Sequence, residues 1–416
     1  MSPRIRRLAA DLEHSNRVAV MNEFWREMEK NGAPIVEPDP DDPNYRQVTF
    51  VWRDRDGSTE NVVVLWGPAP YWDVPSNTFE RLTGTDVWYR TYRVRSDMRG
   101  RYILSPNDPL TPLAKEGTPE ARERYGRFIP DPLNPEVLRV PRNPSDPLSI
   151  ERRFSILELP DAPPQPWAGP RNSEPRELPE HRVTSRILGN DRPVWVHTPV
   201  DYDPDGPPLP LLVILDGRAW IEQLSVVPTL DNLRADDRIP PMVTVLVDSL
   251  DWQTRSRELT CHEPFLEFLG TELMPWIHAR WPIVDDPERR ILDGLSYGGL
   301  TALLAGLRIP DVFGNVIAHS PSLWWGPSTS SDEGAEWLTR QYAVTPRQPV
   351  RAYVEMGLNE GPAMIPTARH LRNVMEAKEY DMTYVEYNGG HDLNCWRGGL
   401  AEALRVLAGS WGGVHA

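Results

Sequence analysis

The second half of the chain restricts the fold most, because short apolar strands alternate there with helical segments. Strands are expected at Leu211–Leu215, Met242–Val247 and Val350–Met356, and Glu263–Arg280 has the spacing of an amphipathic helix. Strands that are apolar on both faces are typical of a parallel sheet buried between helices. We therefore predict a mainly parallel sheet. Further strands are expected at Val194–Thr198, Ile291–Leu292, Val316–Ala318 and Met382–Tyr387, and the first two in the chain, Val194–Thr198 and Leu211–Leu215, are expected to pair antiparallel.

The first part of the chain has a different pattern. In Gln47–Arg53, Asn61–Trp66 and Val87–Val94, β-branched and aromatic residues alternate with polar ones, which predicts short strands. Prolines then gather between Pro106 and Pro179, where they disfavour long helices and central strands. At 416 residues the chain exceeds what one core usually serves. We predict a small N-terminal β-sandwich domain (1–150), a proline-rich linker (151–182) and a larger α/β domain (183–416).

Composition excludes several classes of function. The formal net charge of −15 repels phosphate, so binding to nucleic acid or to an acidic membrane is not expected. The basic start of the chain lacks the apolar core of a secretory signal, and no stretch reaches the ~18 apolar residues of a membrane span. Two cysteines, Cys261 and Cys395, are too few for a disulfide framework and lack metal-ligand spacing. We expect a cytoplasmic protein with reduced thiols and no metal site.

Residues 294–299 read Gly-Leu-Ser-Tyr-Gly-Gly and contain the pattern G-x-S-x-G. The pattern follows a short apolar strand, Arg290–Leu292, and precedes Leu300–Leu307, which has helical periodicity. Its small residues allow a sharp turn that lifts the Ser296 hydroxyl above the sheet. Strand, turn and helix together predict an α/β-hydrolase catalytic domain with Ser296 as nucleophile. An ordinary glycine-rich turn is the alternative.

A serine hydroxyl needs a base to take its proton, and α/β-hydrolases present their residues in the order serine, acid, histidine. His391 lies in the loop after the last expected strand and is the predicted base. Glu360 follows the penultimate strand and is the predicted acid, which would complete a catalytic triad. Asp381, Asp392 and a dyad without a strong acid are the alternatives. His319 follows a strand but has no catalytic context, so a structural role is expected for it.

Ester hydrolysis places negative charge on the carbonyl oxygen, so backbone N–H groups must point at that oxygen. One donor is expected to be the N–H of Tyr297, directly after the nucleophile. The other is expected from the loop after Leu211–Leu215, where Gly217 permits an unusual backbone path. The sequence does not separate Gly217 from Arg218 as that donor.

The chain resembles the enterochelin (enterobactin) esterase family of ferric siderophore hydrolases. The resemblance is carried by Arg81–Leu110, Leu215–Trp220, the pattern around Ser296 and Gly389–Leu400, and it spans most of the chain. Members of this family cleave the ester bonds of a cyclic trilactone, or of its linear fragments, in the cytoplasm, which frees the iron. The resemblance implies the same serine nucleophile and histidine base, with a covalent acyl-serine intermediate.

The resemblance also implies a pocket for an iron(III) complex, with the metal as part of the substrate and no cofactor. A ferric tris-catecholate is anionic and flat-faced, so arginine and tryptophan suit it through charge pairing and stacking. Arg255 falls on the arginine of the family's R-x-x-E-L pattern, and a structural pair with Glu258 is its alternative. The N-terminal domain is expected to form one wall of the pocket. The candidate binding residues are Arg255, Trp220, Trp324, Trp325, Trp396 and Arg397, and a core position is the alternative for each tryptophan.

Two other functions fit the same residues. One is hydrolysis of another acyl ester, such as a feruloyl or acetyl sugar ester, by the same catalytic machinery. Binding of a glycan by the N-terminal domain would favour that function. The other is a siderophore-binding protein without turnover, which tight binding without active-site serine labelling would favour.

Overall fold

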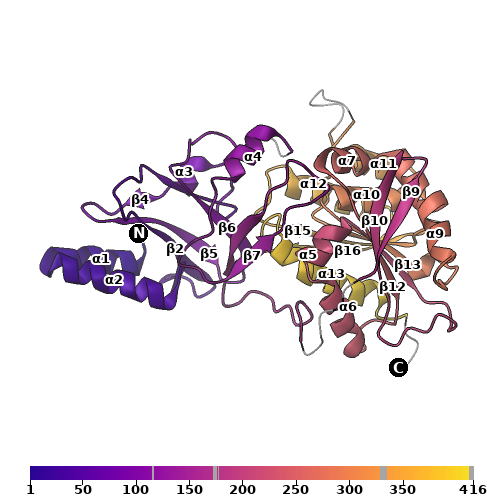
Figure 1. The fold of residues 1–416 in the computed structure, drawn as a ribbon, viewed down its shortest axis with the longest axis horizontal. Helices are drawn as coiled ribbons and strands as arrows, with labels where there is room; N and C mark the ends of the chain where they lie inside the picture. Colours follow the sequence, from indigo (N-terminus) through magenta and orange to yellow (C-terminus); the bar gives the residue numbers. More distant parts are fainter. Residues whose placement is uncertain (115–116, 172–175, 177, 328–334, 412–416) are drawn as a thin grey trace. The chain divides into compact units, whose positions relative to one another are not determined.

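The computed structural model describes residues 1–114, 117–171, 176, 178–327 and 335–411 (Figure 1). The contacts divide the chain into two compact units. The first unit comprises Met1–Pro144, Leu148–Pro164 and the short segment Asn388–Asp392. The second unit comprises Ser145–Pro147, Gln165–Tyr387 and Leu393–Ala416.

Two antiparallel sheets of four strands form the frame of the first unit, as the predicted β-sandwich requires. Both sheets send buried side chains, including Phe50, Val64 and Tyr102, into one shared core. The three strands predicted from the sequence are confirmed as β2, β3 and β5. The first sheet has the order β1 (Ile35–Pro38), β2 (Tyr45–Arg53), β5 (Val87–Arg95), β4 (Glu80–Arg81). The second has the order β3 (Val62–Leu65), β6 (Arg99–Pro106), β8 (Arg152–Glu158), β7 (Val137–Val140).

Two helices that the sequence analysis did not predict precede the first sheet, α1 (Pro3–His14) and α2 (Arg17–Asn31). Each begins at a capping side chain, because Ser2 and Asn16 accept hydrogen bonds from backbone N–H groups of the first turn. One apolar face of each helix packs against β2 and β5, on the side turned away from the sandwich core. Two short helices, α3 (Val74–Asn77) and α4 (Pro119–Tyr125), complete the helices described for this unit.

The linker expected over residues 151–182 begins later than predicted. Arg152–Glu158 forms β8, which pairs with β6 on one side and β7 on the other. Prolines lie on both sides of β8 but not within it, so each of its residues keeps a backbone N–H for the sheet. At the other end of the expected linker, Glu180–Ser185 forms β9. Residues 172–175 and 177 lie outside the described residues.

One eight-stranded sheet forms the centre of the second unit, in the order β16-β15-β14-β13-β11-β12-β10-β9. The strands from β16 to β12 run parallel, whereas β10 pairs antiparallel with both of its neighbours, β12 and β9. The mainly parallel sheet is therefore confirmed. The pairing expected for its first two strands is wrong, because β10 lies beside β12 and not beside β11. The strands are β9, β10 (Asn190–His197), β11 (Leu211–Leu215), β12 (Val243–Val247), β13 (Arg290–Leu295), β14 (Asn315–His319), β15 (Arg351–Gly357) and β16 (Asp381–Tyr387).

Helices cover both faces of this sheet (Figure 1). On one face, α8 (Glu263–Phe268), α9 (Met274–His278), α10 (Tyr297–Arg308), α11 (Trp337–Val344) and α12 (Met364–Ala377) share one apolar core with the strands. On the other face lie α5 (Gly217–Glu222), α6 (Val226–Ala235) and α13 (Leu393–Ala408). The helix expected at Glu263–Arg280 consists of α8, a π-helical turn (Leu269–Leu273) and α9. The remaining elements are α7 (Trp252–Glu258) and a 3₁₀ turn, Pro287–Arg289.

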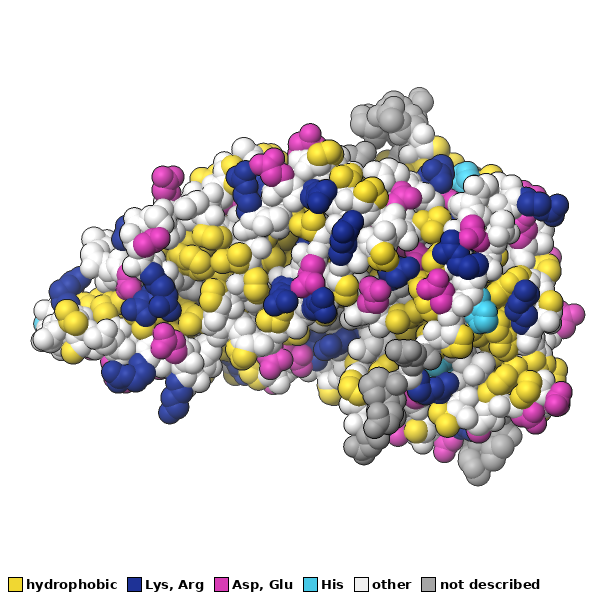
Figure 2. Space-filling view, in the orientation of Figure 1, with side chains coloured by type: hydrophobic (Ala, Val, Ile, Leu, Met, Phe, Trp, Pro, Cys, Tyr) yellow, Lys and Arg dark blue, Asp and Glu magenta, His cyan; other side chains and the backbone are white. Residues whose placement is uncertain are grey.

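Basic and acidic side chains are interspersed on the face shown in Figure 2. Many arginines of the described part of the chain form ion pairs, as Arg182 does with Asp191 and Arg171 with Asp236. Exposed pairs of this kind contribute little to stability. Because the two signs of charge are interspersed, the described side chains on this face form no extended basic surface of the kind that attracts a phosphate backbone. None of the described helices combines the length and apolar character needed to cross a bilayer.

Candidate active site

Ser296 lies at a strained turn between β13 and α10. Its φ of 57° and ψ of −113° are values that residues with side chains rarely adopt. Hydrogen bonds hold the turn on both sides, because the Ser296 N–H donates to His319 O (2.8 Å) while Leu300 and Ser322 donate to Ser296 O (3.0 and 3.1 Å). The predicted strand, turn and helix are therefore present, and they place the serine at the carboxyl edge of the sheet.

Close backbone contacts explain the two glycines that flank this serine. A Cβ atom at Gly294 would overlap the backbone of Gly298, where α10 crosses over the end of β13. A Cβ atom at Gly298 would come within 3.3 Å of the Asp216 carboxylate. The pattern G-x-S-x-G is thus required here by the approach of the helix to the strand.

The loop after β11 leads directly into α5, which begins at Gly217. The unusual backbone conformation predicted for Gly217 belongs instead to Asp216, whose φ is 58° and ψ is 37°. Glycine is required at 217 for another reason, since a Cβ atom there would lie 2.6 Å from the backbone of Leu246 in β12. The first N–H groups of a helix have no acceptor within it, which suits the predicted donors Gly217, Arg218 and Tyr297, the first residue of α10. Their role as oxyanion donors stays a prediction.

The structural alternative for Arg255, a pair with Glu258, is wrong. Arg255 Nε and Nη2 donate to the two carboxylate oxygens of Asp216, each at 2.7 Å, and Nη2 also lies 3.3 Å from Leu295 O. Glu258 pairs with Arg192 instead, at 2.6 Å. Arg255 therefore connects the loop that precedes α5 with the end of the strand that precedes Ser296.

Aromatic side chains lie beside the nucleophile within the second unit. The ring of Tyr297 is 6.3 Å from Trp252 and 6.2 Å from Trp324, and the Arg255 guanidinium lies 5.7 Å from Trp252 and 5.6 Å from Tyr297. Trp324 is 40% exposed, as a residue that binds a ligand must be. Trp252 was not predicted from the sequence, although its position three residues before Arg255 on a helix places both on one face.

Ser322 is a second residue that the sequence analysis missed. Its Oγ lies 3.3 Å from Ser296 Oγ. The residue follows β14, and only the pairing of β14 with β13 brings it to the nucleophile. No local pattern distinguishes it from an ordinary loop serine.

Glu360 is a buried carboxylate just beyond β15. Its Oε1 accepts hydrogen bonds from Gly357 N (2.8 Å) and from the Ser320 hydroxyl. Ser320 Oγ in turn lies 3.1 Å from the Tyr387 hydroxyl and accepts from Trp396 Nε1 (2.9 Å). Glu360 is therefore held in place by neighbours and is not a solvated loop carboxylate. Its role as the triad acid stays a prediction.

His391 lies in the loop between β16 and α13, within the segment that belongs to the first unit. That segment is bound to β6, because Arg99 N donates to Asn388 O (3.1 Å) and Arg101 N donates to Asp392 Oδ2 (2.6 Å). Asp392, one of the alternative acids, is thus a buried carboxylate that holds the loop to a strand. The pairing of His391 with Ser296 stays a prediction.

Several other residues that the sequence suggested for the site are buried in the core or contact other side chains. Trp220 is fully buried, with its ring 5.5 Å from that of His319, and Trp396 is 3% exposed, so neither is available to bind a substrate. The core alternative is correct for both. Arg397 donates to Gln165 Oε1 (2.7 Å), and Trp325 packs edge-on against Trp337. Asp381, the other alternative acid, pairs at the surface with Arg351.

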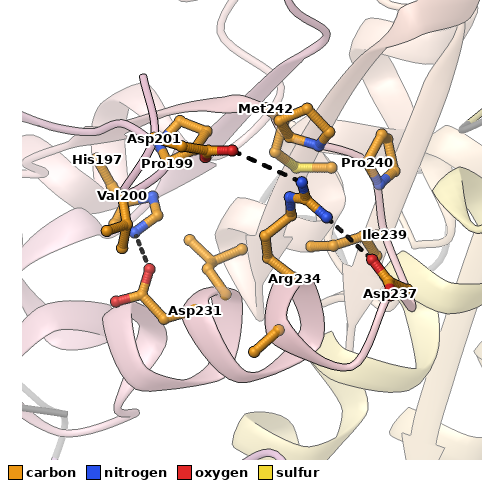
Figure 3. A pocket seen from close by; sticks show the side chains of 13 residues that line it. His197, Pro199, Val200, Asp201, Asp231, Arg234, Asp237, Ile239, Pro240 and Met242 are labelled. Carbon is orange, nitrogen blue, oxygen red and sulfur yellow. Dashed lines mark hydrogen bonds and ion pairs between the residues drawn. The ribbon is translucent and has the colours of Figure 1, made fainter. Parts of the chain in front are cut away.

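A hollow of about 310 Å³ lies at the end of the sheet opposite to Ser296, near the end of β10 and the start of β12 (Figure 3). Its charged side chains pair with one another, Arg234 with Asp201 (3.8 Å) and Asp237 (3.1 Å), and His197 with Asp231 (2.9 Å). Among the residues that the structure describes, no group of histidine, cysteine and acidic side chains is arranged to hold a metal ion.

The mainly parallel sheet and the serine turn after β13 define an ester hydrolase of the α/β-hydrolase type. The Esterase family model matches residues 185–407, and the model described as "Enterochelin esterase, N-terminal" matches residues 47–168. The chain belongs to the enterochelin (enterobactin) esterase family.

Individual relatives cover nearly the whole chain. The iron(III) enterobactin esterase of Escherichia coli O6:H1 is 32% identical over 374 residues, which cover 86% of this chain and 90% of that protein. The crystal structure of the ferric enterobactin esterase from Salmonella typhimurium matches with a TM-score of 0.77 and 30% identity, over 93% of this chain and 98% of that one. The enterobactin esterase from Shigella flexneri, solved in the presence of enterobactin, matches with a TM-score of 0.71 and 29% identity, over 92% and 97%.

Proposed function

We propose that this chain hydrolyses the ester bonds of a ferric catecholate siderophore of the enterobactin type. The observation that carries the proposal is the strained Ser296 with the aromatic surface of Tyr297, Trp252 and Trp324 beside it. A ferric tris-catecholate presents flat aryl faces, which stack well on indole and phenol rings. The names of the relatives, iron(III) enterobactin esterase and iron(III) salmochelin esterase, support the same class of substrate.

The first unit contains an aromatic and cationic group of its own. The Arg101 guanidinium lies 4.2 Å from the ring of Phe154, and that of Arg152 lies 5.3 Å from the ring of Tyr125. Trp72 of the same unit is 42% exposed. Such groups suit an anionic aryl ligand, and the expectation that the N-terminal unit forms a wall of the pocket stays a prediction.

In the proposed reaction Ser296 Oγ attacks the ester carbonyl carbon while His391 takes the hydroxyl proton. Backbone N–H groups of Tyr297 and of Gly217 or Arg218 stabilise the negative charge that develops on the carbonyl oxygen. The intermediate then collapses, so that the alcohol leaves with the proton from the imidazolium and the acyl group stays on the serine.

Water completes the cycle. His391 removes a proton from the water molecule as it attacks the acyl-serine, and a second tetrahedral intermediate releases the carboxylic acid and the free serine. Glu360 is proposed to orient the imidazole and to stabilise its protonated form. Each turnover opens one ester bond of the siderophore.

Iron(III) enters this reaction as part of the substrate, and we propose that the chain uses no cofactor of its own. We also place the reaction in the cytoplasm, where cysteines stay reduced. Among the described residues, Cys261 and Cys395 are not joined in a disulfide bond. Burial raises the pKa of the Cys261 thiol, which keeps it protonated and unreactive.

Incubation of the purified chain with ferric enterobactin tests the proposal, with the linear fragments followed by chromatography. We expect loss of the cyclic ester and appearance of shorter linear products. Ser296→Ala should keep the fold and bind the siderophore, while turnover falls by about 10³-fold or more. An intact siderophore alongside rapid turnover of feruloyl or acetyl esters would contradict the substrate assignment. Tight binding without labelling of Ser296 by a fluorophosphonate would indicate a binding protein.

A further inference from the structure

Three titratable side chains meet beneath the serine turn, within the second unit. Asp293, His319 and Glu355 lie near the carboxyl ends of the adjacent strands β13, β14 and β15. The His319 ring lies between the two carboxylates, with Nδ1 2.7 Å from Glu355 Oε1 and Nε2 2.9 Å from Asp293 Oδ1. The exposed fractions are 0% for Asp293 and His319 and 3% for Glu355. The three residues, here called the strand-end cluster, exclude water from their contacts.

The geometry indicates that His319 is an imidazolium. A neutral imidazole has one N–H, but both ring nitrogens of His319 face carboxylate oxygens. The contact with Asp293 is an ion pair without a well-aligned hydrogen bond, and neither Asp293 oxygen accepts a hydrogen bond from any described side chain. A buried carboxylate in that position needs a positive charge beside it. His319 is the group that supplies the charge.

The pKa direction of His319 agrees with this assignment. Burial alone would lower the pKa of His319, but the charges of Asp293 and Glu355 outweigh burial and raise it to about 10. The pKa of each carboxyl group is raised, with burial as the largest cause, and the positive charge of His319 lowers both pKa values against that rise, so the charge assignment rests on the geometry. Two further acids face the cluster, Asp216 on the side of Asp293 and Glu360 on the side of Glu355.

The other elements packed against the cluster bring no second cation into contact with the imidazole among the described residues. The indole of Trp220, from α5, covers the His319 ring at 5.5 Å. Helix α13 covers Glu355 with Gly399, where a Cβ atom would overlap the carboxylate. Asp216 is itself paired with Arg255, so its charge is already balanced. His319 therefore faces two carboxylates in a dry environment.

Backbone hydrogen bonds connect the strand-end cluster to the residues of the proposed reaction. His319 O accepts the N–H of Ser296 (2.8 Å), and Glu355 O accepts the N–H of Ser320 (2.8 Å). The Ser320 hydroxyl in turn binds the Glu360 carboxylate. A change in the spacing of β13, β14 and β15 would thus move both the nucleophile and the proposed acid.

We propose that His319 is a positioning residue, which as a buried imidazolium fixes the spacing of the strand ends that carry Ser296 and Glu360. The inference rests on the proposed function, because it takes these two residues as nucleophile and acid. It goes beyond that function by assigning a charge state and a role to a histidine outside the triad.

Nitrogen NMR of the full chain with labelled histidine tests the charge state directly. We expect both ring nitrogens of His319 to carry protons up to at least pH 8, with the signals assigned by their loss in His319→Gln. Neutral imidazole signals at pH 7 would overturn the proposal. Because this measurement involves no substrate, it stands even if the siderophore is not hydrolysed.

Kinetics test the positioning role. In His319→Gln, kcat for a simple aryl ester should fall by about 10-fold or more while KM changes by less than about 3-fold, because the reacting groups are displaced and the binding surface is retained. Fluorophosphonate labelling of Ser296 should slow in parallel. His370→Gln is the matched control, since His370 pairs with Glu336 at 2.8 Å at an exposed site. A folded His319→Gln with the kcat of the wild type would overturn the proposal.

A second variant covers the case in which His319→Gln does not fold. Glu355→Gln removes one of the two carboxylates and keeps the ring, so the pKa of His319 should fall toward neutrality. We expect its kcat to stay near that of the wild type at pH 6 and to drop as His319 loses its proton in the NMR titration. A kcat of Glu355→Gln that does not change as His319 loses its proton would contradict the role of the charge. Failure of the wild type to be labelled at Ser296 would count against the proposed function and not against the charge state.

Discussion

Arg255 holds Asp216 through two hydrogen bonds of 2.7 Å, from Nε to Oδ1 and from Nη2 to Oδ2. Asp216 is the residue with positive φ that turns the chain from β11 into α5. The hydroxyl of Ser249 also donates to this carboxylate, at 2.6 Å. The pair therefore fixes the backbone from which Gly217 and Arg218 are proposed to donate to the oxyanion.

Replacing Arg255 by Lys should lower kcat by about 10-fold or more, because a lysine ammonium cannot form the two parallel hydrogen bonds. The measurement is steady-state hydrolysis of an aryl ester and of the ferric siderophore. Arg257→Lys is the matched control on the same helix, because its side chain is 57% exposed. An unchanged kcat in Arg255→Lys would show that the Asp216 turn holds its conformation without the pair.

Replacing Glu360 by Gln should lower kcat by about 10² to 10⁴-fold if this carboxylate orients His391, since an amide cannot stabilise the imidazolium. The variant keeps an oxygen that can accept from Gly357 and Ser320, so the fold should be preserved. Asp381→Asn and Asp392→Asn test the two alternative acids under the same assay. A large loss in either of these, with a small loss in Glu360→Gln, would reassign the acid.

Trp324 and Trp220 should respond in opposite ways to replacement by Ala. Trp324 is 40% exposed, so its loss should raise KM for the ferric siderophore by about 3 to 10-fold with little effect on stability. Trp220 is fully buried, so its loss should lower the free energy of unfolding by about 3–5 kcal/mol. Denaturant unfolding and siderophore kinetics of both variants check the pair. Equal effects on KM would contradict the assignment of Trp324.

The first unit should become less stable as the pH rises from acid to neutral, because the buried Asp131 loses its proton in this range. Burial raises the pKa of this carboxyl group to about 6, and the Tyr102 hydroxyl donates to it at 2.9 Å. Since the folded pKa lies above the unfolded value of about 4, the contribution to stability is complete below pH ~4 and is lost as the pH rises past about 6.

Asp131→Asn removes that titration. The free energy of unfolding of the wild type, measured relative to the variant, should therefore fall as the pH rises from 4 to 7. Urea unfolding at several pH values gives this difference. Asp161→Asn is the control, because the Asp161 side chain is 59% exposed. A difference that does not change with pH would contradict the raised pKa of Asp131.

The serine turn could be predicted from sequence because its determinants are local. The glycines, the serine and the first turn of α10 are consecutive, and the central strands β11 and β12 are buried along their whole length. The helices α1 and α2 also had local signals that were overlooked, namely the caps Ser2 and Asn16 before apolar residues at helical spacing.

Other features of the site depend on contacts between distant parts of the chain. Trp220 and Trp324 are the same residue type, and the packing of α5 makes Trp220 a core residue while Trp324 stays exposed. The partners of His319 lie on the two neighbouring strands, so strand order alone brings the three side chains together. Arg255 was selected as a substrate-binding residue, a role that stays a prediction, and its partner Asp216 lies in the loop after β11 and not on its own helix.

Gly399 shows how far the buried charge reaches into the rest of the sequence. A methyl group at this position would occupy the space of the Glu355 carboxylate, although the residue lies within α13 where alanine is normally the better helix former. The helix therefore accepts an unfavourable residue so that a strand can keep an acidic one. In a related sequence with a smaller neutral residue at position 355, position 399 no longer needs to be glycine. Positions 355 and 399 should therefore vary together.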